Sequence, residues 1–405
     1  MSNGATVTHR AAGRATLARQ HLLERTRATA AAEIAHLAGM QAQAPLAPYV
    51  GLWTRLHGFE PAELSALHHE RRVVRMALMR STIHLVTAED AVAWRPLVES
   101  VIVRATDGAF ARHYHGLDRA ALAAAARELT EQAPRTFAEL GALLAERFPG
   151  RDPAALAQAA RAHLPLVQIP PRGVWGAGGG RIAHTTADAW LGGGPGPNRD
   201  SDADGDGEGP APRRAPDPAA MLERYLAAFG PAGVMDAQAW SGLTRLREVF
   251  ERLGRRLRVF TGQDGAQLYD LPDAPRPDPD TPAPARFLPE YDNLLFAHAD
   301  RTRVNPAGRR IPLFPGNGAA LGYFLLDGVW SGLWRVDRER DRPRARAAGT
   351  TAAAAAATAR VTLTVQHFDP LAAAQREELT AEGLALLALL APDAASHDIR
   401  FAPAP

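Results

Sequence analysis

Three stretches of the chain share one order of local structure, a set of short helical patterns followed by a β-hairpin. Apolar residues at helical spacing predict the helices, and β-branched runs bounded by turn residues predict the strands. The predicted helices span residues 16–24, 29–40, 49–56, 61–79, 120–131, 136–148, 153–162, 219–229 and 239–255. The predicted strands span residues 81–87, 166–169, 174–175, 181–185, 257–260 and 266–269. Short helices closed by a hairpin are the minimal pattern of a winged helix, so we expect three winged-helix modules in series.

The last third of the chain is predicted to be rich in strands. Strands are expected at residues 286–288, 311–314, 322–336 with a turn at Asp327-Gly328, and 360–367, before an amphipathic helix at 371–390 and a last strand. The fold class is therefore α+β. We expect winged helix 1 at residues 1–90, winged helix 2 at 91–192, an acidic Gly/Pro linker at 193–216, winged helix 3 at 217–272 and a C-terminal β-rich region at 285–405.

Two residue types are missing from the composition. The chain has no cysteine, and all 46 of its basic residues are arginine because it has no lysine. These absences exclude disulfides, cysteine-ligated metal centres, thiol nucleophiles, a lysine Schiff base and a P-loop lysine. Residues 200–208 hold five acidic residues and no basic one, so the rest of the chain carries +7 against +2 for the whole. This basic remainder favours a polyanionic partner.

The sequence shows no sign of a membrane segment or of a secretory signal. No run of eighteen apolar residues occurs, and the N-terminal stretch lacks the apolar core of a signal peptide. We therefore expect a cytoplasmic protein with no membrane partner. No heptad pattern or long apolar edge indicates association, so we expect a monomer.

Four motifs superficially suggest a ligand, and each is better explained without one. Residues 200–205 copy half of an EF-hand loop but lack its closing glutamate, and a linker fits them better. His68-His69-Glu70 cannot be a zinc-deaminase motif without cysteines and is interpreted as a solvated helix face. His113 and His115 lack a third ligand, which indicates a surface loop. Residues 176–180 lack the spacing of a phosphate loop and indicate a hairpin turn. We expect no metal and no cofactor.

A pair of glutamines is a candidate functional feature. Gln41 and Gln43 are two residues apart on a predicted loop that Pro45 and Pro48 restrain. Glutamines are common on helix ends and surfaces, so local composition alone leaves a solvated pair as the alternative.

Four blocks of sequence extend this observation across the chain. They are LAGMQAQAPLAPYVGLWTRL at residues 37–56, MRSTIHLV at 79–86, LPEYDNLL at 288–295 with HADRTRV at 298–304, and LDGVWSGLW at 326–334. In content and order these blocks resemble the signature of the AlkZ-like DNA glycosylases, a family of winged-helix proteins. The acidic insert near 198–209 and the Arg/Ala-rich loop near 338–357 have no counterpart in that signature.

The resemblance implies tandem winged helices around double-stranded DNA and hydrolysis of the N-glycosidic bond of N7-alkylated purines, bulky adducts and interstrand crosslinks included. Gln41 and Gln43 match the Gln-x-Gln branch of the family, which includes self-resistance enzymes of bacteria that make DNA-alkylating antibiotics. An N7-alkylated base is cationic and leaves readily, so a glutamine needs only to place a water beside the sugar. On this basis Gln43 is the catalytic residue that places the water, and Gln41 supports the loop or the sugar.

Five further residues are candidates for binding DNA. Arg80, Thr82 and His84 adjoin the first predicted wing, and Arg301 and Arg303 lie in a turn after residues 286–288. The functional interpretation is that they bind backbone phosphates and present the lesion. The alternative is that Thr82 and His84 pack in a strand and that the arginines form a solvated rim. Trp53 is expected to pack beneath the glutamine loop.

Two other functions remain open at this level. A winged-helix protein can be a non-catalytic regulator, and a lesion-binding protein can sequester an adduct without releasing the base. Three modules in series suit the wrapping of one lesion site better than the single module typical of regulators. Since glycosylases that also nick the strand commonly use an amine, the absence of lysine predicts a monofunctional enzyme.

Overall fold

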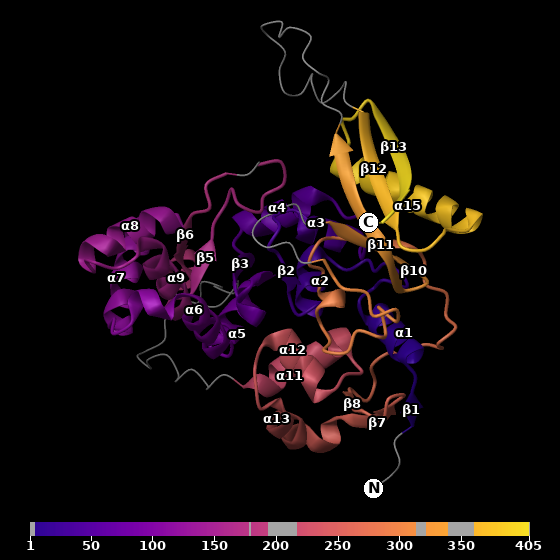
Figure 1. Ribbon diagram of the computed structural model, residues 1–405, viewed down its shortest axis with the longest axis horizontal. Coiled ribbons are helices and arrows are strands. Elements are labelled where there is room, and N and C mark those ends of the chain that lie inside the picture. Colours follow the sequence, from indigo (N-terminus) through magenta and orange to yellow (C-terminus); the bar gives the residue numbers. More distant parts are fainter. Residues whose placement is uncertain (1–4, 178–179, 193–216, 313–320, 339–359, 405) are drawn as a thin grey trace, which may run out of the picture.

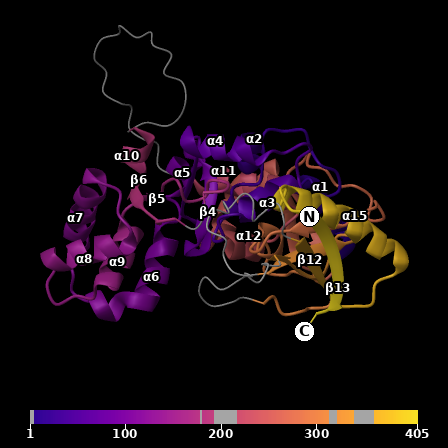
Figure 2. The same cartoon turned by 90° about the horizontal axis from the view of Figure 1, so that it is seen from above.

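The computed structural model describes residues 5–177, 180–192, 217–312, 321–338 and 360–404. The acidic linker and most of the Arg/Ala-rich loop predicted near 338–357 lie outside these ranges. In Figure 1 the second module lies at one end of the molecule and the C-terminal sheet at the other, with the first and third modules between them; Figure 2 shows the same order from above. Helices and several sheets alternate along the chain, which confirms the predicted α+β class.

The first module packs three short helices against a hairpin. Its elements are α2 (Ala30–His36), β2 (Met40–Gln41), α3 (Ala47–Trp53), α4 (Pro61–His69), β3 (Val73–Ala77), the turn η1 (Met79–Ser81) and β4 (Ile83–Thr87). Ile34, Tyr49, Leu52, Leu64 and Leu85 form part of its core and are almost completely buried. The strand β2 pairs antiparallel with β4, which places residues 40–41 on the edge of the sheet.

The second module shares this sheet. Its elements are α5 (Ala88–Trp94), α6 (Glu99–Tyr114), α7 (Arg119–Gln132), α8 (Phe137–Arg147), α9 (Pro153–His163), β5 (Leu166–Gln168), β6 (His184–Thr186) and α10 (Ala187–Leu191). The strand order is β2-β4-β3-β5-β6, so β3 and β5 join the two hairpins through main-chain hydrogen bonds. The expected boundary near residue 90 therefore does not separate two sheets. The predicted capping box is present, with Thr136 and Glu139 bonded reciprocally.

The third module matches the expected pattern most closely, and the N-terminal segment packs on it. It consists of α11 (Pro218–Phe229), α12 (Val234–Ser241), α13 (Leu246–Leu253), η2 (Gly254–Arg256), β7 (Arg258–Gly262) and β8 (Gln267–Asp270). The N-terminal strand β1 (Thr6–Val7) adds to β7 in parallel, and α1 (His9–Arg19) follows. Arg19 and Asp270, both buried, form an ion pair at 2.7 Å that fixes α1 to this module.

The C-terminal region is a five-stranded sheet with one helix on it. Its elements are β9 (Arg286–Leu288), η3 (Asn293–Leu295), β10 (Gly322–Leu326), β11 (Val329–Arg338), β12 (Arg360–His367), α15 (Ala373–Leu390) and β13 (Ser396–Pro403). The strand order is β13-β12-β11-β10-β9, in which only β12 and β13 run parallel because α15 connects them. Leu379, Leu386 and Leu387 of α15 are buried against Phe287 and Leu363 of the sheet.

Several predicted elements were wrong in detail. The single helix expected at 61–79 is a helix and a strand, because Arg71 has a φ of 60° and Val73-Val74 continue as β3. The helix expected at 239–255 is interrupted at Gly242, whose φ is 80°. The strand expected at 174–175 is absent, and β5 pairs with β6 directly. The helix expected at 16–24 is α1, which starts earlier because Thr8 caps it. Helices α5 and α6 were not predicted.

Four further expectations concern two histidine motifs, one predicted strand and the membrane. His68 is 3% exposed, so the interpretation of residues 68–70 as a solvated face was wrong for this histidine. His113 lies in the last turn of α6 rather than in a loop. Of residues 311–314, the first two form no strand and the others lie outside the described ranges. Within the described residues, no helix has the length and apolar character needed to cross a membrane.

Candidate active site and DNA interface

Gln41 is held at the edge of the shared sheet rather than in a free loop. It ends β2, opposite His84 of β4, and its side chain is 8% exposed. Its Oε1 accepts a hydrogen bond from Nη2 of Arg80 at 2.9 Å. Because a guanidinium can only donate, the amide oxygen must face Arg80 and the amide nitrogen must face away from it.

Gln43 is exposed, yet it is anchored to the same strand. The backbone N–H of Ile83 donates to Oε1 of Gln43 at 3.2 Å, and the backbone N–H of Ala42 donates to the carbonyl of Ile83 at 2.8 Å. A carbonyl oxygen has two lone pairs, so Oε1 of Gln43 retains one for another donor. The structure thus brings Gln41, Gln43 and Arg80 together, and we call these three residues the glutamine cluster.

Arg80 connects the glutamine cluster to distant parts of the chain. It has a φ of 55°, and its guanidinium donates to the Trp240 carbonyl at the end of α12 and to Oδ1 of Asn293 at 3.4 Å. Asn293 in turn donates to the Gly39 carbonyl at 3.1 Å. Burial, together with the neighbouring Arg301, lowers the pKa of Arg80 to about 10. Arg80 was predicted to bind DNA; in this structure its guanidinium contacts protein groups.

His84 and Thr82 lie inside the same turn. His84 is fully buried, and its Nδ1 lies 3.1 Å from the carbonyl of Thr82. Burial and the charge of Arg80 lower the pKa of His84 to about 3, so the ring is neutral at ordinary pH. The Thr82 hydroxyl donates to the Met79 carbonyl at 3.1 Å. The alternative of packing within a strand therefore describes His84 better than the predicted contact with phosphate.

The two arginines expected in the turn after β9 differ sharply. Arg301 is exposed, and its guanidinium lies 5.8 Å from the centre of the Phe296 ring. Only 6% of the Arg303 side chain is exposed, and it donates to the Pro231 carbonyl at 2.8 Å and to the Thr16 hydroxyl at 3.2 Å. Arg301 is thus open to a partner, whereas the prediction that Arg303 binds phosphate is not supported by its placement.

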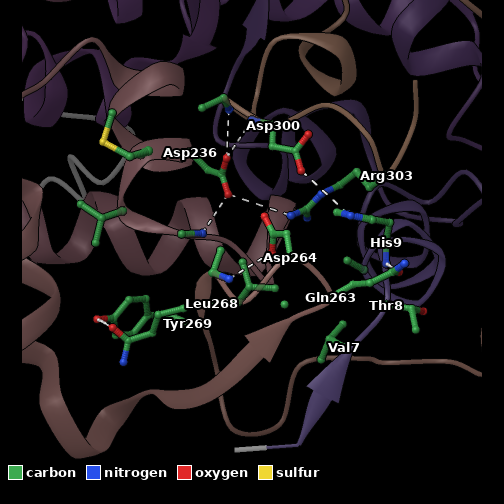
Figure 3. Close-up of a pocket in the computed structure, with 18 of the residues that line it drawn as sticks. Val7, Thr8, His9, Asp236, Gln263, Asp264, Leu268, Tyr269, Asp300 and Arg303 are labelled. Atoms are coloured by element: carbon green, nitrogen blue, oxygen red, sulfur yellow. Dashed lines mark hydrogen bonds and ion pairs between the residues drawn. The ribbon is translucent and has the colours of Figure 1, made fainter. Parts of the chain in front are cut away.

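Arg303 lies beside a cavity that has a volume of about 280 Å³. This cavity, which we call the wing pocket, lies between β1, the start of α12 and the β7–β8 hairpin (Figure 3). Asp236 accepts hydrogen bonds from the backbone N–H groups of Gly233 and Ala299 at 2.8 and 2.9 Å. Asp300 lies next to Asp236, and His9 lies 3.8 Å from Asp300 (Figure 3).

The cavity beside Gln41 is far smaller, at about 10 Å³. It is lined by Gln41, Met40 and Asn293 and by the buried pair Arg55–Asp292, whose two hydrogen bonds measure 2.8 and 2.9 Å. This volume is about that of one water molecule. Arg55, Asp292 and Asn293 were missed as residues of this cavity, although all three lie in the blocks at 37–56 and 288–295 that carry the family resemblance.

Trp53 is half-buried between the first module and the C-terminal sheet, and the guanidinium of Arg25 lies 4.9 Å from its ring centre. Within the described residues, no group of three or more His, Asp or Glu side chains is arranged to hold a metal ion. The side chains of the glutamine cluster are two amides and a guanidinium.

The chain is a winged-helix protein with three modules, and its glutamine cluster lies on the sheet that the first two modules share. The model of the family described as DNA glycosylase AlkZ-like matches residues 34–389, and the chain belongs to this family. Among solved structures, the Streptomyces sahachiroi DNA glycosylase AlkZ is similar to this chain, with a TM-score of 0.67 at 17% sequence identity. The match covers 98% of this chain and all of that one. No curated protein matches the chain in sequence.

Proposed function

We propose that this chain is a monofunctional DNA glycosylase that hydrolyses the N-glycosidic bond of N7-alkylated purines in double-stranded DNA. The observation that carries the proposal is the glutamine cluster, in which both amides are fixed on one sheet edge by donors from β4 and its preceding turn. Bulky adducts and interstrand crosslinks are included in the proposed substrate class. The biological role would be DNA repair or self-resistance to a DNA-alkylating antibiotic.

The orientation of the two amides supports a division of labour between them. Gln43 retains a free lone pair on Oε1, so it can accept a hydrogen bond from a water and aim that water at the anomeric carbon. The same oxygen places partial negative charge beside the oxocarbenium-like sugar. An amide does not abstract protons near neutral pH, so the step depends on the N7-alkylated base being a cationic leaving group.

Gln41 is suited to a supporting role. Its oxygen is occupied by Arg80, which leaves the amide N–H groups to face the sugar or the phosphodiester. The positive charge of Arg80 polarises this amide and strengthens it as a donor. We propose that Gln41 orients the substrate while Gln43 orients the water.

The exposed Arg301 is the proposed contact with a DNA phosphate. Its charge helps to lower the pKa of Arg80, which supports a phosphate contact on the same side of the molecule as the glutamine cluster. Arg303 and His84 are left out of this interface because both are buried. Thr82 remains a candidate only through its partly exposed surface.

The absence of lysine supports a product with an intact abasic site. A combined glycosylase and lyase commonly forms an imine between a lysine or terminal amine and the sugar. We expect borohydride treatment during turnover to trap no covalent protein–DNA complex. A strong trapped band would assign lyase activity to another amine, such as the N-terminus.

Release of free base tests the proposal. Duplexes that carry one N7-methylguanine, or one bulky N7-guanine adduct, are incubated with the wild-type protein, and the free base and the abasic site are measured. We expect base release from at least one duplex. Tight DNA binding with no release from either duplex would instead support a regulator or a protein that sequesters lesions.

A further inference from the structure

Arg75 is a buried cation on β3, beneath the glutamine cluster. It is 1% exposed, and within the described residues it forms no ion pair with a carboxylate. Nη2 of Arg75 donates to the carbonyl of Ala42 at 2.6 Å, and Nε donates to Oε1 of Gln168 at 3.4 Å. Nη1 is buried and has no hydrogen-bond partner in the described part of the chain.

A buried arginine without an ion pair lowers the stability of the folded state. A buried charge without a counter-charge loses its hydration and gains no ion pair in exchange. Burial and the nearby Arg172 lower the pKa of Arg75 to about 9, which leaves the guanidinium charged at neutral pH. A buried methionine would fill similar space without this cost, so the guanidinium must contribute something that an apolar side chain does not.

The residue that Arg75 binds lies between the two candidate catalytic glutamines. The N–H of Ala42 donates to Ile83 on one side, and the carbonyl of Ala42 accepts from Arg75 on the other. Both backbone polar groups of Ala42 are therefore fixed. Because the peptide planes on either side of Ala42 lead directly to Gln41 and Gln43, fixing them sets the directions in which both side chains leave the main chain.

The second module closes over Arg75 from the other side. Gly173 has a φ of +88°, and a Cβ atom at this position would lie 2.6 Å from Cδ of Arg75. The Gly173 carbonyl accepts a hydrogen bond from the Tyr49 hydroxyl at 2.7 Å, so the segment cannot retreat without losing that bond. The side chain of Arg75 is thus confined between Ala42 and the segment that follows β5.

We propose that Arg75 is a positioning residue that orients the Gln41–Gln43 pair for base release, and that the second module holds it in place through Gly173. This inference rests on the proposed glycosylase function. Arg75 acts through Ala42 and does not touch the substrate. Arg75 lies where β3 and β5 pair, opposite Gln168, and it is packed against both modules.

The test compares Arg75→Met and Arg75→Lys with a matched control, Arg95→Met. Arg95 is 3% exposed and donates to the Ala162 carbonyl at 2.7 Å, so its loss removes the same kind of bond away from the glutamine cluster. For each variant we would measure the melting temperature, the affinity for lesion DNA and the single-turnover rate of base release. We expect Arg75→Met to slow base release about 100-fold with little change in affinity, because misplacing a catalytic group by about 1 Å has that effect.

We expect Arg75→Lys to recover part of the rate and Arg95→Met to lose thermal stability without slowing base release. Equal rates for Arg75→Met and Arg95→Met at matched stability would overturn the inference. If Arg75→Met does not fold, Gly173→Ala replaces it, since the added methyl group must displace Arg75; an unchanged rate in Gly173→Ala would likewise overturn it.

A second measurement does not depend on activity. Hydrogen exchange of the amides at residues 40–44 should be faster in Arg75→Met than in wild type and unchanged in Arg95→Met. If the wild-type protein releases no base, the proposed function fails, whereas this exchange result still tests whether Arg75 orders the loop. If the wild-type protein releases base and neither exchange nor rate responds to Arg75, only the inference about Arg75 fails.

Discussion

The glutamine cluster and the wing pocket differ in the volume of the cavity beside them and in the hydrogen-bonding groups that remain free. The wing pocket has a volume of about 280 Å³, but Asp236 on its wall is occupied by backbone N–H groups from two segments. The cavity beside Gln41 has a volume of about 10 Å³, yet Gln43 keeps a free lone pair and Gln41 keeps its amide donors. Cavity volume therefore favours the wing pocket as the functional site, whereas the free hydrogen-bonding groups favour the glutamine cluster.

This difference bears on how a lesion would be recognised. A cavity of about one water beside Gln41 is too small for a purine, and of the two glutamines only Gln43 is exposed, whereas Gln41 is buried. The wing pocket is the junction at which the N-terminal strand, the third module and the turn containing Arg303 meet, and its polar groups fasten these parts together.

Removal of Arg80 should damage the cluster most. Arg80→Ala leaves Oε1 of Gln41 without its donor and removes the link to Trp240, so we expect single-turnover base release to fall about 100-fold. Arg104→Ala is the control, because Arg104 donates to the adjacent Gly242 carbonyl at 2.9 Å and does not touch Gln41. Equal rates for the two variants at saturating enzyme would mean that Arg80 does not orient the glutamine.

Removal of Arg303 should affect folding and leave the chemistry intact. Arg303→Ala deletes two partly buried hydrogen bonds beside the wing pocket, and we expect the free energy of unfolding to fall by about 2 kcal/mol. The measurement is urea denaturation, with base release assayed well below the transition. A rate of base release that falls as far as in Arg80→Ala would instead place the wing pocket within the catalytic machinery.

The stability of the fold should depend on pH in the acid range, whereas the two amides of the glutamine cluster do not titrate. Burial lowers the pKa of His68 from its ordinary 6.5 to about 3, so the unfolded chain binds this proton more readily than the folded one. Stability should therefore be lost as pH falls below about 6.5, by at most about 1.4 kcal/mol per pH unit for this group.

The slope of stability against pH isolates this contribution. We expect His68→Gln to lower the slope measured by urea denaturation between about pH 6 and 4, while His69→Gln, at an exposed neighbouring position, leaves it unchanged. The same slope in both variants would show that the buried ring of His68 is not the group responsible.

The smallest expected effect belongs to Arg301. If this exposed side chain binds one phosphate, Arg301→Ala should lower the slope of log affinity against log salt concentration by about 1. The control is Arg303→Ala, which should keep the wild-type slope because its guanidinium is enclosed. An unaltered slope in Arg301→Ala would place Arg301 on a solvated rim.

Local signals in the sequence predicted the parts of the fold that depend on neighbours in the chain. The β7–β8 hairpin, the capping box at Thr136 and the strand β9 follow from residues within a few positions of each other. The helix expected over residues 61–79 failed because Val73–Ala77 is buried on both faces, which removes the alternation that marks a strand. Because the strand was not predicted, Arg75 within it was not identified as a candidate residue.

The candidate site was predictable only in part for a related reason. Gln41 and Gln43 could be selected from a short block, but the partners of Arg80 and Arg303 could not, because arginine is ordinarily exposed. Arg80 is half-buried and the Arg303 side chain is buried because their guanidinium groups donate to carbonyls of distant segments, at Trp240 and Pro231. Trp240 lies well over a hundred positions from Arg80, and Pro231 lies several tens of positions from Arg303. A local sequence pattern cannot indicate partners at such separations.

The most direct test of the account replaces Gln43, with Gln263 as its control. Both glutamines accept a hydrogen bond from a backbone N–H at 3.2 Å, Gln43 in the glutamine cluster and Gln263 at the wing pocket. Base release from duplex DNA containing N7-methylguanine would be followed under single-turnover conditions, together with DNA affinity. We expect Gln43→Ala to be slower than wild type by about 100-fold or more at similar affinity, and Gln263→Ala to match wild type. Undiminished release by Gln43→Ala would contradict the assignment of the glutamine cluster as the active site.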